Sequence, residues 1–143
     1  MKNKKIFLLA LTLTSFCIAG CTTAVPYSFA QDERETATIT FYTNRNKEGV
    51  DLQYFEDIEL PFPGKTNYWA PVIFPAGRPF KLTVNVYKDH LEKGDEKIFN
   101  CPALTAGNDY KLEYKPSRFL GIGGNKLILT DMKTKKSVYE QQL

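Results

Sequence analysis

Few side chains in this chain have the types and spacing that catalysis requires. His90 is the only histidine, so a Ser-His-Asp triad or a histidine general base would have to use it. It stands in the charged segment 88–96, a pattern typical of a solvated hairpin loop. The acids of that segment lack the ligand spacing of a calcium-binding loop. We therefore expect a non-enzymatic protein without a metal site or a cofactor. The alternative is a hydrolase or an accessory catalytic domain that uses His90.

The thiol of Cys21 is the second group with distinctive chemistry, because of the residues before it. Residues 1–5 carry three lysines and no acid, residues 6–19 are almost continuously apolar, and the small residue Gly20 precedes the thiol. A basic head, an apolar middle and small residues at the end are typical of a signal peptide. The apolar run is shorter than the ~20 residues that a membrane-spanning helix needs. We expect residues 1–20 to be removed.

The tetrapeptide Ile18-Ala19-Gly20-Cys21 resembles the lipobox of bacterial lipoproteins, although that family more often has Leu at the position of Ile18. The resemblance implies a diacylglyceryl cysteine at Cys21, cleavage between Gly20 and Cys21, and in many bacteria acylation of the new amine, for example by palmitate. It also implies a lipid anchor in the cell envelope. Because Thr22 rather than Asp follows the cysteine, it implies the outer membrane in a Gram-negative cell. In a bacterium that is not Gram-negative, the resemblance implies the outer face of the plasma membrane.

A conventional signal peptidase is the competing interpretation of this segment. Ser28-Phe29-Ala30 has small residues at the spacing that such an enzyme recognises, although it lies farther from the apolar run than usual. Cleavage there would give a soluble secreted or periplasmic protein.

Charge and cysteine content fit an exported domain. The chain has 19 basic and 16 acidic residues, and the three lysines of residues 1–5 account for the whole excess. The remaining chain is near neutrality, so nothing in it predicts a nucleic-acid partner. Cys101 is the only cysteine left after cleavage and acylation, so we expect a small buried thiol and no internal disulfide.

The chain divides into three parts: a signal peptide (1–20), a lipidated N-terminus with a polar, aperiodic tether (21–35), and one domain (36–143). Within the domain, apolar and polar residues alternate over 36–42, 80–87 and 110–115, as expected for half-buried strands. Further strands are expected near 50–55, 67–74, 96–101, 126–131 and 136–141, with turn residues between them. We predict a single antiparallel β-sandwich, Ig-like or transthyretin-like, of about seven to eight short strands.

One local pattern occurs twice, 30 residues apart. Residues 76–84 and 106–114 each read as an Ala-Gly turn followed by a strand with an inward aromatic and an inward leucine. The pattern resembles strands of carboxypeptidase-regulatory-like, transthyretin-like and PEGA-type sandwich domains, and it brings no functional residues with it.

Aromatic residues concentrate between positions 54 and 74, and strand alternation cannot bury all of them on one face. Two interpretations are open: Tyr54, Phe62, Tyr68 and Trp69 form a partner surface, or Trp69 is the core aromatic of the sandwich and its neighbours pack around it. The sequence thus predicts a non-enzymatic binding or assembly module, held to membrane lipid through acylated Cys21. Its partner would be an envelope protein or a glycan.

Overall fold

The structure, a computed structural model, describes residues 26–30, 34–44, 47–61, 70–89, 93–117 and 124–143. Nine strands and no helix lie in these ranges. They are β1 (Thr36–Phe41), β2 (Gly49–Phe55), β3 (Ile58–Glu59), β4 (Val72–Pro75), β5 (Phe80–Tyr87), β6 (Asp95–Cys101), β7 (Asp109–Lys115), β8 (Lys126–Asp131) and β9 (Lys136–Gln142). The all-β fold predicted from alternation is confirmed.

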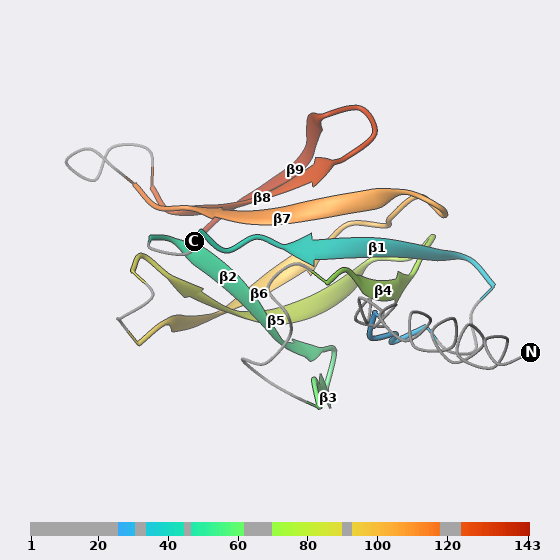
Figure 1. Ribbon diagram of the computed structural model, residues 1–143, viewed down its shortest axis with the longest axis horizontal. Coiled ribbons are helices and arrows are strands. Elements are labelled where there is room, and N and C mark those ends of the chain that lie inside the picture. Colours follow the sequence, from blue (N-terminus) through green and yellow to red (C-terminus); the bar gives the residue numbers. More distant parts are fainter. Residues whose placement is uncertain (1–25, 31–33, 45–46, 62–69, 90–92, 118–123) are drawn as a thin grey trace, which may run out of the picture.

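The strands form two sheets that pack as a β-sandwich (Figure 1). The five-stranded sheet has the order β4-β1-β7-β8-β9, and the four-stranded sheet has the order β3-β2-β5-β6. Every neighbouring pair of these strands is antiparallel except β1 and β7, which are parallel with Ile39 opposite Tyr110. No hairpin joins β1 to β7, so their relative direction is not fixed by a tight turn.

Two details of the predicted sandwich are therefore corrected. The sheets are mostly rather than wholly antiparallel, and the described residues hold nine strands rather than seven or eight. The additional strand, β3, has only two residues and follows β2 through the turn Glu56-Asp57, in which Glu56 has φ 51°. Two residues are too few for alternation to reveal a strand.

The core lies between the sheets, and the two copies of the repeated pattern face it. Phe80 and Leu82 of β5 are buried, as are Tyr110 and Leu112 of β7. Gly77 and Gly107, which precede these strands, have φ 79° and 77°, a conformation that costs glycine little. Cys101 is also buried, with 1% of its surface exposed, as expected.

Residues 27–30 pack against the sandwich and extend its sheet. The N–H of Phe29 donates to the carbonyl of Ile73 (2.9 Å), and the N–H of Ile73 donates to the carbonyl of Tyr27 (2.8 Å). Ser28 and Ile73 form a parallel bridge, so this segment covers the outer edge of β4. These residues belong to the tether predicted for 21–35, and in the structure they contact the domain. Packing of the rings of Tyr27 and Phe29, which sequence periodicity does not show, places them there.

On the opposite side of the molecule, one side chain joins the edges of the two sheets. The amide of Gln141 in β9 donates to the carbonyl of Ile98 (2.7 Å) and accepts from the N–H of Asn100 (2.8 Å). Both partners belong to β6, the edge strand of the four-stranded sheet. Gln141 therefore makes the pair of hydrogen bonds that a neighbouring strand would make.

Candidate functional site

Among the four aromatic residues predicted to bind a partner, the structure describes Tyr54. Phe62, Tyr68 and Trp69 lie outside the described residues, as do the predicted cleavage and lipidation residues Gly20 and Cys21 and the histidine of the alternative, His90. Their roles stay predictions.

Tyr54 belongs to a row of side chains on the outer face of the four-stranded sheet. The register places Tyr54 of β2 opposite Glu59 of β3 and opposite Thr83 of β5, and Thr83 opposite Ile98 of β6. Ile98 is 57% exposed, whereas Tyr54 and Thr83 are half-buried. We call Glu59, Tyr54, Thr83 and Ile98 the outer row. It combines an aromatic ring, an aliphatic side chain and polar groups, a mixture common in protein interfaces.

A chain of hydrogen bonds lies near one end of this face. The hydroxyl of Tyr87 donates to Oγ1 of Thr43 (2.9 Å), and Thr43 donates to Oδ1 of Asp51 (3.5 Å). Burial raises the pKa of Asp51 to about 6, against the lowering effect of the Thr43 hydrogen bond. Gly49 leaves room for the Tyr87 ring, because a Cβ there would lie 2.4 Å from it. The network holds the β1–β2 connection against β5.

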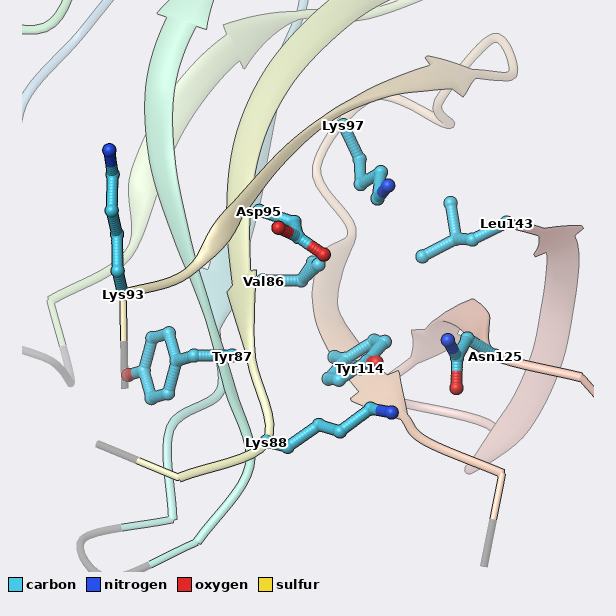
Figure 2. A pocket seen from close by; sticks show the side chains of 9 residues that line it. All are labelled: Val86, Tyr87, Lys88, Lys93, Asp95, Lys97, Tyr114, Asn125 and Leu143. Carbon is cyan, nitrogen blue, oxygen red and sulfur yellow. The ribbon is translucent and has the colours of Figure 1, made fainter. Parts of the chain in front are cut away.

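A pocket of about 320 Å³ opens between the sheets at one end of the sandwich. It is lined by Val86, Tyr87, Lys88, Lys93, Asp95, Lys97, Tyr114, Asn125 and Leu143. Figure 2 shows the side chains of Asp95, Lys97 and Leu143 turned toward a common space, with Lys88 reaching toward Tyr114. Lys93 extends away from that space. Ammonium, carboxylate, phenol and amide groups are hydrogen-bonding groups, so the lining of the pocket is largely polar.

Two charged residues of the pocket lie on the inner face of β6. The register places Lys97 opposite Val84 and Asp95 opposite Val86, in line with the buried Phe99. Burial and then the negative charge of Asp95 raise the pKa of Tyr114 above its ordinary value. An inward-pointing charge on an edge strand also discourages pairing with another chain, which gives Lys97 a structural role.

Sequence reasoning did not find this pocket, although one signal was present. Between positions 95 and 101 of β6, the inward positions change from charged to apolar. The change marks the point at which the strand leaves the core. Pairing with β5 shows which positions of β6 face inward. The sequence of β6 alone does not identify that partner strand.

Within the described ranges, no three His, Cys, Asp or Glu side chains gather closely enough to hold a metal ion. In the same part of the chain, no helix has the length and apolar character needed to cross a membrane. No protein-family model matches the chain, and neither a curated protein nor a solved structure matches it.

Proposed function

We propose that this protein is a lipid-anchored envelope protein whose β-sandwich acts as a non-enzymatic binding or assembly module. The observation that carries the binding role is the outer row, where the exposed Ile98 stands beside Thr83 and the half-buried ring of Tyr54. An apolar centre surrounded by polar groups suits a protein partner or the face of a sugar ring. The partner is an envelope protein or a glycan.

The docked segment 27–30 supports an anchor at Cys21. The ring of Phe29 lies 5.0 Å from that of Phe55 and 5.6 Å from that of Phe74, and Ala30 is only 5% exposed. Cleavage after Ala30 would remove these residues from the folded domain and uncover the edge of β4. Cleavage between Gly20 and Cys21 retains them, so the packing favours the lipoprotein site over the conventional one.

The anchor is tested by replacing the thiol. Cys21→Ser removes the acceptor of the diacylglyceryl group, so the variant should lose labelling by radioactive palmitate and leave the membrane fraction. One acyl chain holds a protein weakly and two hold it stably, so the loss should be nearly complete. Unchanged membrane retention of Cys21→Ser would contradict the anchor.

The binding surface is tested with a matched pair of variants. Ile98→Glu places a charge in the outer row, whereas Val138→Glu places the same charge on β9 of the other sheet at an aliphatic residue of similar exposure, 49% against 57%. In crosslinking and pull-down from intact cells, Ile98→Glu should lose a partner that the wild type and Val138→Glu retain. Equal recovery from both variants would contradict this surface.

His90→Ala separates the proposal from its alternative. We expect this variant to keep both its fold and its partner, because the outer row does not include His90. Loss of a hydrolytic activity without unfolding would favour the envelope hydrolase.

A further inference from the structure

The chain is attached to the sandwich closer to Cys21 than its sequence suggests. Tyr27 and Phe29 contact the domain through backbone hydrogen bonds with Ile73 and through aromatic packing, and Ala30 is buried beside them. The rings of Tyr27 and Phe29 also pack edge to face, with centroids 4.8 Å apart. The first contact that the structure describes between the N-terminal part of the chain and the sandwich is therefore at Tyr27, well before the start of β1.

The largest possible distance between Cys21 and Tyr27 follows from the number of residues between them. Six Cα–Cα steps separate Cys21 from Tyr27, so the segment spans at most ~20 Å when fully extended. The anchor thus keeps Tyr27 within about 20 Å of the lipid surface.

The width of the five-stranded sheet exceeds that reach. Segment 27–29 lies outside β4, and β1, β7, β8 and β9 follow across the sheet (Figure 1). At ~4.8 Å per strand, the distance from this segment to β9 is about 24 Å. If β9 rested on the lipid with β4 above it, Tyr27 would lie beyond the reach of the anchor.

From these lengths we infer that the β4 side of the sandwich is held toward the bilayer surface, with β9 on the side turned away from it. This inference rests on the proposed lipidation of Cys21 and adds the orientation of the anchored domain. The β2–β3 hairpin belongs to the near side, because Phe55 at the end of β2 packs on Phe29. Its exposed acids Glu56, Asp57 and Glu59 oppose insertion into an anionic surface. The short attachment, rather than adsorption, therefore sets the orientation.

Energy transfer from the domain to labelled lipid measures the orientation. Cys21 is acylated in the mature protein, and burial raises the pKa of the Cys101 thiol to about 12, so an added surface cysteine can be labelled selectively. Ile58→Cys on β3 reports the near side, and Val138→Cys on β9 reports the far side; their exposed fractions are 54% and 49%. In vesicles of phosphatidylethanolamine and phosphatidylglycerol with an acceptor lipid, we expect several-fold stronger transfer from the Ile58→Cys label. Equal transfer from the two labels would overturn the inference.

Two further variants lengthen the chain between Cys21 and the first residue that contacts the sandwich. A ten-residue Gly-Ser insertion between Thr22 and Thr23 should weaken transfer from the Ile58→Cys label and bring the two labels closer to equality. Phe29→Ala should act in the same direction, because releasing residues 27–30 moves the point of attachment toward β1. An insertion that leaves both signals unchanged would overturn the inference.

Lipid incorporation distinguishes failure of this inference from failure of the proposed function. If the wild type takes up no radioactive palmitate, the anchor itself is wrong and the orientation fails with it. If the wild type is acylated and the two labels transfer equally, the anchor stands and the orientation alone is wrong.

Discussion

The carboxyl group of Asp51 makes folding stability depend on pH. Its folded pKa of about 6 lies above the ordinary value of 3.8, so the folded state binds a proton that the unfolded chain has already released. The free energy of unfolding should therefore fall as the pH rises from about 4 to about 6 and stay low above that range. At ~1.4 kcal/mol per pKa unit, the fall is at most about 3 kcal/mol, and solvent near this half-buried group reduces it.

Asp51→Asn tests this dependence, because the amide keeps an oxygen that accepts from Thr43 and carries no charge. The variant should exceed the wild type in urea-unfolding free energy by about 1–2 kcal/mol at pH 8. Near pH 4 the protonated carboxyl resembles the amide, so the two proteins should then agree, which provides an internal control. Curves of stability against pH that run parallel for the two proteins would contradict the assignment.

At the residue scale, the sequence predicted the burial of a side chain where neighbours along the chain decide it. It did not predict the environment of a side chain whose contacts come from distant segments. The burial of Cys101 followed from its place among apolar strand residues and is confirmed. The environment of Asp51 depends on Thr43 and Tyr87, which lie on other segments of the chain. The pocket depends on Tyr114 and Lys97 in different sheets. No spacing within one segment reveals such pairs.

At the scale of elements, alternation predicted β1, β5 and β7, and runs bounded by turn residues predicted the other strands of six or more residues. Most of these strands have one face on the core, which the period of two records in the sequence, whereas β9 has no buried residue. The sequence predicted β3 and β4 least well, because strands of two and four residues are too short to show a period of two. The docked segment 27–30 carried no period at all, because packing of Tyr27 and Phe29 rather than alternation places it.

Gln141 closes the edge of β6, and its removal should expose that edge. Gln141→Ala takes away two hydrogen bonds to the backbone of β6, so we expect a loss of about 1–2 kcal/mol in unfolding free energy. The freed N–H of Asn100 and carbonyl of Ile98 could then pair with a strand of another molecule. Light scattering at rising protein concentration should show dimers or larger species.

Gln142→Ala is the matched control for that change, since it removes the same side chain from the neighbouring, exposed position of β9. It should leave both stability and mass close to the wild-type values. Equal behaviour of the two variants would show that Gln141 does not protect the edge.

At the scale of the whole molecule, the docked segment 27–30 connects the proposed lipid attachment with the stability of the fold. Residues 27–30 cover the edge of β4, while Gln141 covers part of the edge of β6. In the proposed orientation, the residues that would hold the sandwich near lipid also complete one side of it. A cleavage site therefore determines how complete the folded domain is.

Chains that begin at different residues test this link directly. A soluble chain that begins at Thr22 retains the docked segment, whereas a chain that begins at Gln31 lacks it. Loss of the Phe29 ring from its contacts with Phe55 and Phe74 should cost about 3 kcal/mol in unfolding free energy, since truncation of a buried phenylalanine costs ~3–5 kcal/mol and this ring is half-buried. The shorter chain should also self-associate, because the edge of β4 is then uncovered.

Phe29→Ala in the longer chain is the control that assigns this loss to packing. It should reproduce most of the loss in thermal or urea unfolding, while a chain that begins at Pro26 should match the one that begins at Thr22. Equal stability of the chains that begin at Thr22 and Gln31 would mean that the segment adds nothing to the fold. It would also remove the structural reason for preferring cleavage before Cys21 over cleavage after Ala30.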